Sequence, residues 1–342
     1  MRSFAIWYES TENKIAEDNK NNIKADIHIN LFSNPDSDTW YIDFGIMVQP
    51  IKLISQIHIY CPFNLDKNDV YDIGKLINDS LVRGIFNEDY KVTNNASKRK
   101  LVTGNHNGKK NSFIIYTLNK TEEIQIDKLE REDNGNLGTI ITIDVSDIRK
   151  FHDDNDDFTS EDKYYFRIRL RVSYKEIQAI SCNFEGKPLL QLTLSKTDII
   201  DFRLNNTRSL CKEVRNKISL GKAFLVKSVH YIILRDYKDD IIYNSDKKCS
   251  TRLLEKDIWH SYFEDLFNEH IIAYHFKEKA IEGNDSSGIN QFNILVKFRK
   301  NVVKGINIKL YIAGLIFFGV IASLLATAII EILKFYYEIF RG

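Results

Sequence analysis

Three arginines alternate with apolar residues over residues 163–173 of the chain. In an extended strand Arg167, Arg169 and Arg171 point to one face, with neighbouring side chains roughly 6.6 Å apart. Guanidinium groups in such a row can bind phosphate or carboxylate groups through paired hydrogen bonds. We therefore treat these arginines as candidate ligand-binding residues. The alternative is a sheet face on which acidic residues of neighbouring strands neutralise them.

Arg203 and Arg208 lie further along, in the polar segment DFRLNNTR, and they extend the arginine patch if the fold brings them near it. No recognisable catalytic pattern accompanies these residues. The sequence has no GxSxG motif and no pairing of cysteine with histidine at a known spacing. The DFG tripeptide at residues 43–45 falls inside an expected strand, too close to the start of the chain for a kinase. We therefore name no catalytic residue.

The cysteines and histidines do not show the spacing of a metal site. The four cysteines are far apart and form no CxxC pair, which argues against a zinc site and a disulfide scaffold. His260 and Glu264 lie one helical turn apart, and His270 and His275 follow, but the spacing signals no third ligand of defined geometry beside the first two. We predict that these histidines are surface or capping residues. Neither a metal nor a cofactor is expected, and the cysteine usage fits a reducing cytosol.

The sequence feature that indicates where the chain is located in the cell is an uncharged apolar run at residues 310–330, LYIAGLIFFGVIASLLATAII. A helix of this length reaches roughly 30 Å, the thickness of the hydrocarbon core of a bilayer, so we predict one transmembrane helix. Small residues recur on one face of this helix at helical spacing. They are Gly319, Ala322, Ser323, Ala326 and Thr327. Because small faces allow helices to pack closely in lipid, we expect self-association through them.

Basic residues gather on the N-terminal side of the apolar run. They are Lys297, Arg299, Lys300, Lys304 and Lys309. The other side carries two basic and two acidic residues. Since the basic flank of a span tends to stay cytoplasmic, and the N-terminus has no apolar region of signal-peptide length, we expect residues 1 to about 300 to face the cytosol. The expected location is the inner membrane, with the bilayer as a partner.

The overall charge limits the choice of partners. The chain has 48 Lys and Arg against 47 Asp and Glu, so its net charge of +1 creates no general attraction for nucleic acid. We expect no bulk binding of DNA or RNA. An anionic small molecule or a partner protein remains possible as a specific ligand. Abundant Ile, Asn and Lys are typical of an AT-rich bacterial coding sequence.

The soluble part is expected to be mainly β, with sandwich-like architecture and a few helices. Short β-branched and aromatic runs bounded by polar clusters predict strands. They fall at residues 23–32, 40–48, 56–63, 112–118, 138–145, 164–172, 189–194, 224–235 and 291–300. Helical spacing predicts helices at residues 66–86, 209–218 and 251–267.

An acidic stretch at residues 151–162 is the expected domain boundary. It separates a β-rich domain at residues 1–150, with the helix at 66–86 inserted, from a second β-rich domain at residues 151–300. Residues 301–342 form the membrane anchor. Because the connecting stretch is short, one continuous fold is the alternative.

This organisation predicts a membrane-anchored, non-catalytic sensor or effector that oligomerises through its span. The architecture resembles that of membrane-tethered effectors in bacterial antiviral and stress signalling. The alternatives are a membrane-localised nuclease or hydrolase and a passive scaffold for a partner protein. An enzyme should show convergent ionisable groups in a concave site, a sensor a basic pocket, and a scaffold an exposed edge or apolar patch.

Overall fold

The computed structural model describes residues 2–10, 23–33, 39–96, 98–106, 109–130, 136–148, 162–185, 195–245, 247–263, 270–281, 287–301 and 305–341. The chain is mainly β with several sheets, as predicted. Its contacts divide it into two units. The first contains residues 1–182, 200–237 and 243–296, and the second contains residues 183–199, 238–242 and 297–342.

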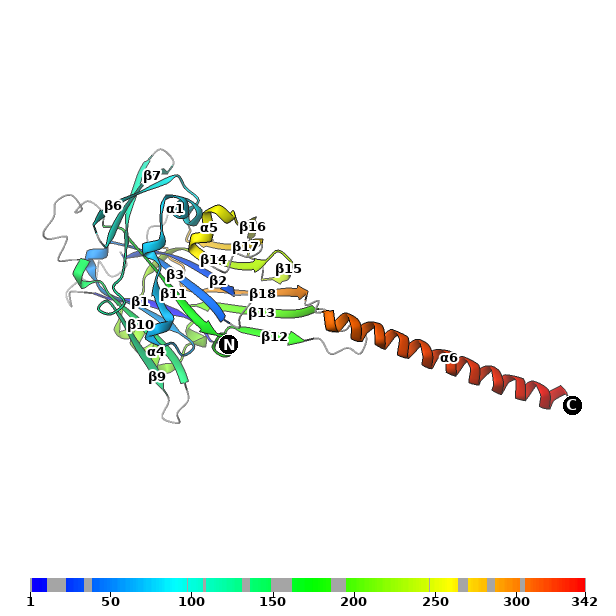
Figure 1. Cartoon of the computed structure of the whole chain (residues 1–342). Helices are drawn as coiled ribbons and strands as arrows, with labels where there is room; N and C mark the ends of the chain where they lie inside the picture. The colour runs from blue at the N-terminus through cyan, green and yellow to red at the C-terminus, as the bar shows by residue number, and fades with distance from the viewer. Residues whose placement is uncertain are drawn as a thin grey trace. The chain divides into compact units, whose positions relative to one another are not determined.

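A ten-stranded sheet forms the centre of the first unit (Figure 1). Its strand order is β16-β17-β14-β2-β3-β11-β8-β7-β6, and β5 pairs with β11. Two neighbouring pairs, β14 with β2 and β11 with β8, are parallel, and the others are antiparallel. The strands are β2 Lys24–Ser33, β3 Thr39–Gln49, β5 Val70–Asp72, β6 Tyr90–Ala96, β7 Arg99–His106, β8 Lys109–Tyr116, β11 Tyr164–Ser173, β14 Leu225–Asp236, β16 Cys249–Leu253 and β17 Ile271–Lys279.

A smaller antiparallel sheet packs against the large one. Its order is β1-β4-β10-β9, with β1 Ala5–Ser10, β4 Ile54–Cys61, β10 Asn136–Asp144 and β9 Ile124–Glu130. Aromatic rings fill the space beside it: the ring of Phe4, which precedes β1, lies 5.5 Å from Phe44 of β3 and 5.1 Å from Phe202. Helix α4, Lys212–Leu220, contributes Val214 to an apolar cluster with Trp7 of β1. The interleaved rings give the sandwich-like core that the strand pattern predicts.

A third sheet has the order β12-β13-β18-β15. Its strands are β12 Ser181–Glu185, β13 Ser195–Leu204, β18 Phe292–Asn301 and β15 Asp239–Asn244. Each of these strands has residues in both units. The strand expected at residues 189–194 lies outside the described residues.

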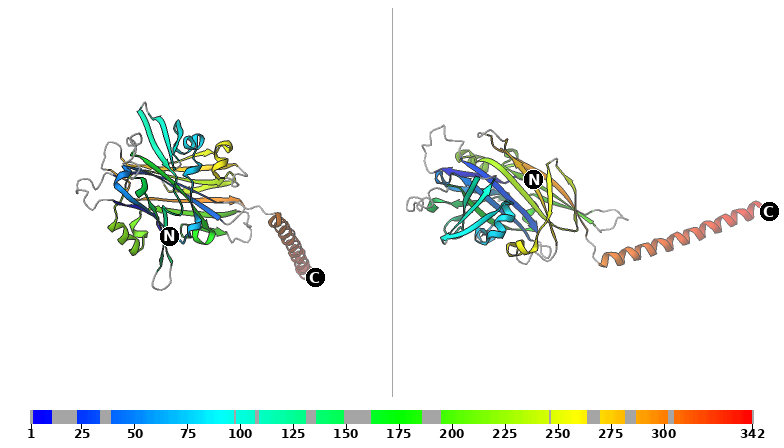
Figure 2. Two further views of the ribbon diagram at one scale, coloured as in Figure 1. Left: turned by 60° about the vertical axis from the view of Figure 1, so that its left-hand side comes forward. Right: turned by 90° about the horizontal axis from the view of Figure 1, so that it is seen from above.

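Two short helices lie side by side on one face of the large sheet (Figure 2). They are α1, Asp79–Phe86, and α5, Lys256–Phe263. Gly84 of α1 comes so close to α5 that a Cβ atom there would lie 2.8 Å from a ring carbon of Trp259. Leu81 and Val82 of α1 join Phe263 of α5 in the apolar cluster beneath them. This packing fixes both helices over the sheet.

The helix expected at residues 66–86 is much shorter in the structure. Only Asp79–Phe86 is α-helical, and it begins where the Asn78 side chain accepts a hydrogen bond from the Leu81 backbone N–H. The preceding residues form two 3₁₀ turns and strand β5. Val70 and Ile73 are buried, and β5 pairs with β11. Their helical spacing therefore arose from burial in a compact connection rather than from an amphipathic helix.

The expected division between residues 150 and 151 does not separate the sheets. Strands β2 and β3 precede that point and β14 and β17 follow it, yet all four are neighbours in the large sheet. Ile27 of β2 lies opposite Val229 of β14, for example. Strand pairing in the large sheet therefore crosses this point. Residues 149–161 of the acidic stretch lie outside the described residues.

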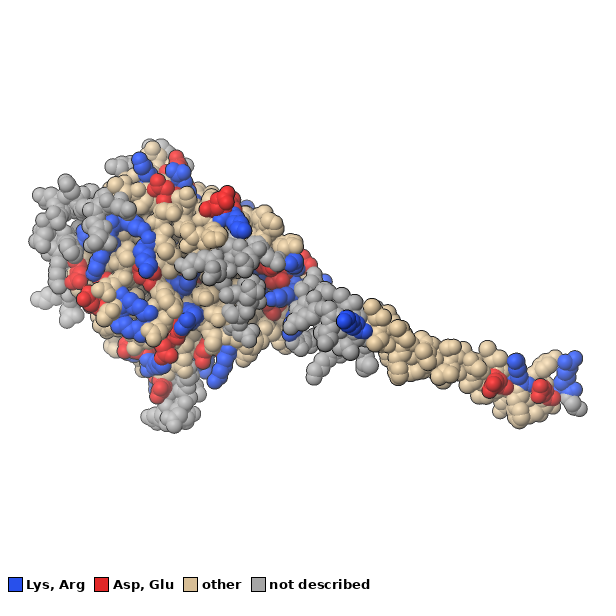
Figure 3. Space-filling view, viewed as in Figure 1, with Lys and Arg blue, Asp and Glu red and all other residues tan. Residues whose placement is uncertain are grey.

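Within the second unit, α6, Gly305–Arg341, is a helix of 37 residues. Of these, Ile312–Arg341 is long and apolar enough to span a membrane, with a mean hydropathy of 2.5 in its most apolar part. Figure 3 shows that charged side chains are confined to the two ends of this helix. The predicted apolar run is thus part of a longer helix.

The residues of the predicted packing face are exposed on α6. Nothing lies within 4 Å of the position that a Cβ atom of Gly319 would take. The Thr327 hydroxyl donates to the backbone oxygen of Ser323 at 3.0 Å, so its hydrogen-bonding capacity is used within the helix. Of the basic flank, Lys309 is exposed on α6, while Lys304 lies outside the described residues. Lys297, Arg299 and Lys300 belong to β18.

The helix predicts how the protein partitions. Full-length protein should stay in the membrane pellet after an alkaline carbonate wash, because the apolar helix is embedded in lipid. A chain ending at Asn301, which retains β18, should become soluble and keep the circular dichroism spectrum of its sheets. Immunoblots of pellet and supernatant measure this, and release of the full-length chain by carbonate would contradict the transmembrane assignment.

Candidate functional site

Polar residues cross one face of the large sheet in adjacent rows. Strand pairing aligns them because residues that face each other across neighbouring strands lie on the same side of the sheet. The first row contains Lys279, Ser228, Asp26, Met47 and Tyr165. The second contains Lys277, His230, His28, Gly45 and Arg167. This is the same face on which α1 and α5 pack.

A cavity of about 700 Å³ opens over the β17, β14 and β2 part of these rows. Five lysines line it: Lys24, Lys163, Lys227, Lys277 and Lys279. The carboxylates in its lining are those of Asp26 and Glu88, so ammonium groups exceed carboxylates by three. We call this cavity the lysine pocket. A concave site with such a charge excess attracts anions.

The charges of the lysine pocket affect one another. Burial lowers the pKa of Lys277, and the neighbouring ammonium group of Lys279 lowers it further, while Asp26 and Glu88 act in the opposite direction. Asp26 in turn accepts a hydrogen bond from the Ser228 hydroxyl at 2.6 Å. An anion between the lysines would relieve their mutual repulsion.

His28 and His230 line the pocket, and His275 lies beside His230. The His230 and His275 rings are stacked 5.1 Å apart, with Nδ1 of His230 3.2 Å from Nε2 of His275. Burial, followed by the charge of Lys277, lowers the pKa of His230 to about 3 and that of His275 to about 4. Burial also lowers the pKa of His28. All three imidazoles are therefore neutral at neutral pH, and the lysines supply the positive charge.

The opposite side of the pocket is aromatic. Phe86, at the end of α1, lies 5.1 Å from the ring of His28 and 5.8 Å from that of Tyr90. The Tyr90 hydroxyl accepts a hydrogen bond from the Asn111 side-chain amide at 2.7 Å. Ile85 and Met47 add apolar surface. The pocket thus combines a cationic side with an apolar, aromatic side.

Beyond His28, the same face continues into a buried ionic cluster. Arg169 donates from Nε and Nη2 to the two oxygens of Asp43, at 2.8 and 3.1 Å. The Tyr262 hydroxyl of α5 donates to the same carboxylate at 2.6 Å. Asp43 is 0% exposed and Arg169 is 9% exposed. A fully desolvated carboxylate is thus held by a bidentate arginine and a tyrosine.

Arg167 is the second cation of this cluster and is 1% exposed. Its Nε donates to the Tyr262 hydroxyl at 2.6 Å, and its Nη1 donates to the Tyr165 hydroxyl. The Asn30 side-chain amide is oriented so that its nitrogen faces an acceptor and its oxygen faces a donor. In this orientation the Asn30 oxygen accepts a hydrogen bond from Arg167 Nη2 at 2.6 Å. Burial opposes the charged form, but the tyrosines and Asp43 outweigh it and raise the pKa of Arg167. The cluster therefore holds two cations and one anion.

The structure places the predicted arginines in three different settings. Arg167 and Arg169 are buried in the ionic cluster, and Arg171 pairs with Asp69 on the surface at 2.9 Å. The alternative of neutralisation by neighbouring acids thus describes Arg169 and Arg171. Arg203 pairs with Asp201 and lines a shallow cavity of about 420 Å³ together with Arg208. Arg203 and Arg208 therefore line one cavity, to which the strand arginines do not contribute.

A second constellation bears on the enzyme alternative. Nδ1 of His58 lies 3.0 Å from the Thr142 hydroxyl, and its Nε2 lies 3.3 Å from the Glu9 carboxylate. Carboxylate, imidazole and hydroxyl occur together in nucleophilic hydrolases. Thr142, however, is 4% exposed in the middle of the small sheet, and the His58 ring is stacked on Trp7. A buried hydroxyl that a substrate cannot reach serves the packing of the sheet.

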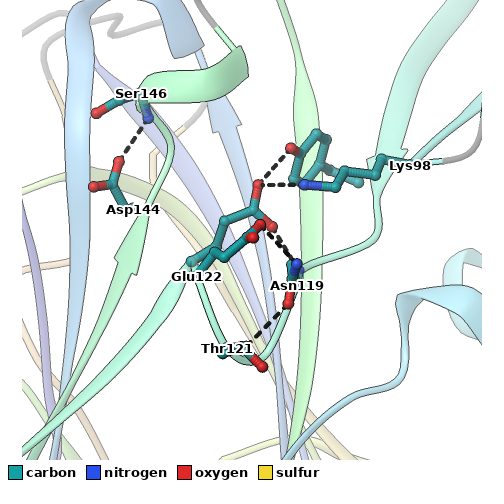
Figure 4. A network of polar contacts seen from close by, with 8 residues as sticks. Lys98, Asn119, Thr121, Glu122, Asp144 and Ser146 are labelled. Carbon is teal, nitrogen blue, oxygen red and sulfur yellow. Dashed lines mark hydrogen bonds and ion pairs between the residues drawn. The ribbon is translucent and has the colours of Figure 1, made fainter.

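A third polar network surrounds the buried carboxylate of Glu123 before β9 (Figure 4). It accepts hydrogen bonds from the Tyr116 hydroxyl at 2.7 Å, from Lys98 at 3.2 Å and from the Asn119 backbone N–H. Figure 4 shows Lys98 and Asn119 approaching this network from two separate connections of the chain. Since protein groups fill the space around both carboxylate oxygens, the network fixes the turn.

Sequence reasoning missed the lysines of the pocket together with His28 and His230, and it treated His275 as a surface or capping residue, whereas this ring stacks on His230. A local signal existed: Lys24, Asp26 and His28 alternate with apolar residues in β2, and His275, Lys277 and Lys279 do so in β17. This alternation indicates a polar face on each strand. It does not reveal that β14 brings the two strands together. Among the described residues, no group of three or more His, Cys, Asp or Glu side chains is arranged to hold a metal ion.

Comparisons with known proteins do not identify the chain. No protein-family model matches it, and no curated protein is similar to it. Among solved structures, it aligns with the Fcho1 Mu homology domain from Danio rerio with bound Eps15 peptide. The identity is 8%, the TM-score is 0.15, and the alignment covers 87% of this chain and 78% of that one. A similarity this weak carries no argument about fold or function.

The ionic cluster predicts a large effect of a small substitution. Asp43→Asn preserves shape but leaves two buried guanidinium groups without a counter-charge, so the free energy of unfolding should fall by about 3–5 kcal/mol. Denaturant unfolding of the full-length protein in detergent, followed by tryptophan fluorescence, measures this. As a control, Arg171→Ala removes an exposed ion pair and should cost about 0.2–1 kcal/mol. Similar losses in the two variants would refute the structural role of Asp43.

Proposed function

We propose that this chain is a membrane-anchored, non-catalytic receptor that binds an anionic small molecule in the lysine pocket. The observation that supports this most is the convergence of five lysines from separate parts of the sequence on one cavity. Ammonium groups that lie close together repel one another, and an anion between them offsets this repulsion. The cavity volume lies within the roughly 300–1,000 Å³ typical of small-molecule sites.

The chemistry of the pocket favours binding over catalysis. A general base works best when its pKa is close to the ambient pH. The pKa values of His230 and His275, about 3 and about 4, leave both imidazoles weakly basic at neutral pH. They can still donate and accept hydrogen bonds as neutral groups. A membrane-localised hydrolase or nuclease therefore has less support than a receptor.

The helix α6 gives the receptor its place in the cell. We propose that it anchors the protein in the inner membrane of a bacterium with the β-rich part in the cytosol. The support for this orientation is the basic residues before the helix, which tend to remain cytoplasmic. Ligand binding would then be signalled to the membrane by self-association of the helix. A role in antiviral or stress defence is an extension that rests on the architecture alone.

Charge reversal in the pocket tests the receptor proposal. For full-length protein in nanodiscs of zwitterionic lipid, the double variant Lys277→Glu, Lys279→Glu should weaken binding of inorganic tripolyphosphate by at least about 100-fold. Each charge-assisted hydrogen bond contributes roughly 1.5–3 kcal/mol, and two are lost. Isothermal titration calorimetry gives the dissociation constants.

The matched control reverses two exposed lysines on α4, Lys212→Glu and Lys217→Glu, which changes the net charge by the same amount. It should leave the dissociation constant nearly unchanged, because distant surface charges are screened by salt. An equal loss in both variants would mean that the phosphate responds to net charge rather than to the pocket. In that case the lysine pocket would not be the binding site.

Bulky residues on the small face of α6 test self-association. Gly319→Ile with Ser323→Ile should abolish crosslinked oligomer in membranes, because the larger side chains keep the helix backbones apart while the segment stays apolar enough to insert. The control, Leu324→Ile with Leu325→Ile, changes residues off this face and should retain the oligomer. If both pairs behave alike, the helix is an anchor without a packing role.

A further inference from the structure

We infer that the ligand of the lysine pocket is a nucleotide with two or three phosphate groups and a base bearing N–H donors. This inference rests on the proposed function and specifies its ligand. It follows from the way in which cationic, aromatic and acidic groups are distributed around the cavity. Each group suits a different part of such a molecule.

The phosphate end belongs at β17 and β14. Lys277 and Lys279 lie directly opposite His230 and Ser228 in the strand pairing, so two ammonium groups, an imidazole and a hydroxyl share one stretch of the cavity wall. Lys24 and Lys227 line the same cavity. The excess of three positive charges matches an anion with a similar number of negative charges. A di- or triphosphate meets this condition, whereas a single carboxylate leaves most of the excess in place.

The buried charge of Arg167 also favours a multiply charged anion in the lysine pocket. The guanidinium group of Arg167 is one of the charges that lower the pKa of His28. Among the residues described above, the ionic cluster holds two cations, Arg167 and Arg169, and one anion, Asp43. This buried charge is not screened by solvent as a surface charge is. It therefore adds to the field that the lysines create in the pocket.

The base end belongs at the end of α1. Phe86 already takes part in an array of rings with His28, Phe113 and Tyr165, at centroid distances of 5.1, 5.0 and 5.1 Å. A nucleobase can extend such an array because every base has a π face. Glu88 follows two residues later and lines the cavity. Carboxylates accept hydrogen bonds from the amino groups of bases.

Glu88 also discriminates against ligands that are anionic throughout. A carboxylate beside a phosphate would repel it, so a polyphosphate without a base cannot use the α1 side of the cavity favourably. A nucleotide places its neutral, donor-bearing base there. Asp26, which accepts from Ser228, limits how far phosphate extends along β2. The pocket thus favours a ligand with one anionic and one aromatic end.

The experiment compares five probes on the full-length protein in nanodiscs of zwitterionic lipid: ATP, GTP, inorganic tripolyphosphate, soluble inositol trisphosphate and adenosine. Calorimetry should show that ATP or GTP binds about tenfold more tightly than tripolyphosphate, as expected for one stacked base. Adenosine, which lacks phosphate, should bind much more weakly. Phe86→Leu keeps an apolar side chain but removes the stacking surface, and it should abolish most of the advantage of the nucleotide over tripolyphosphate.

The variants also report on folding. Phe86→Leu should bind tripolyphosphate as the unmodified protein does, which shows that the pocket is intact. Glu88→Gln, of nearly the same shape, should weaken nucleotide binding and slightly strengthen tripolyphosphate binding, because one repulsive charge is gone. A general loss of structure would weaken the binding of both probes. Opposite changes in the two affinities therefore report on the charge of Glu88.

Three outcomes would overturn the inference. If tripolyphosphate binds as tightly as the nucleotides and Phe86→Leu has no effect, the receptor proposal stands and the nucleotide assignment fails. If soluble inositol trisphosphate binds more tightly than ATP and GTP, the phosphate belongs to a lipid headgroup. If none of the phosphate-bearing probes binds, the proposed function itself fails.

Discussion

The carboxylate of Asp43 is the group on which the polar face of the large sheet depends. It has no exposure to solvent and accepts hydrogen bonds from Arg169 on β11 and Tyr262 on α5. Two strands and a helix are thereby fixed by one anion. Gly45, two residues later in β3, makes this arrangement possible, since a Cβ atom there would lie 2.1 Å from the Tyr165 hydroxyl oxygen. The missing side chain lets Tyr165 and Arg167 cross β3.

The lysine pocket and the ionic cluster are adjacent parts of one surface. Along the second row, the face passes from Lys277 on β17 through the histidines of β14 and β2 to Arg167 on β11. Tyr262 and Phe263 of α5 cover Arg167 and Arg169, which are buried. The lysine part is left open. Helix α5 therefore covers the ionic cluster but leaves the lysine pocket, on the same face of the sheet, open to a ligand.

Local pattern located eight of the eighteen strands that the structure describes. β-branched and aromatic runs located β2, β3, β11, β14 and β18 to within a few residues, and the uncharged run located α6, because burial and lipid both impose a simple pattern on sequence. The pattern failed at residues 66–86, where apolar residues at helical spacing are buried in turns and in β5. It also failed at the arginine strand, since alternation cannot distinguish a ligand-facing row from one covered by α5. The pocket needs the pairing of β2 with β14, whose Asp26 and Ser228 are 202 residues apart, and no local signal encodes that contact.

Hydrogen–deuterium exchange of the full-length protein in nanodiscs, with and without tripolyphosphate, tests the central claim most directly. It locates the bound anion without changing any residue. If the lysine pocket is the site, added protection should appear in peptides covering residues 24–28, 227–230 and 277–281, and the buried strand of Arg167 should be protected in both states. Protection confined to the cavity of Arg203 and Arg208, or absent altogether, would contradict the account.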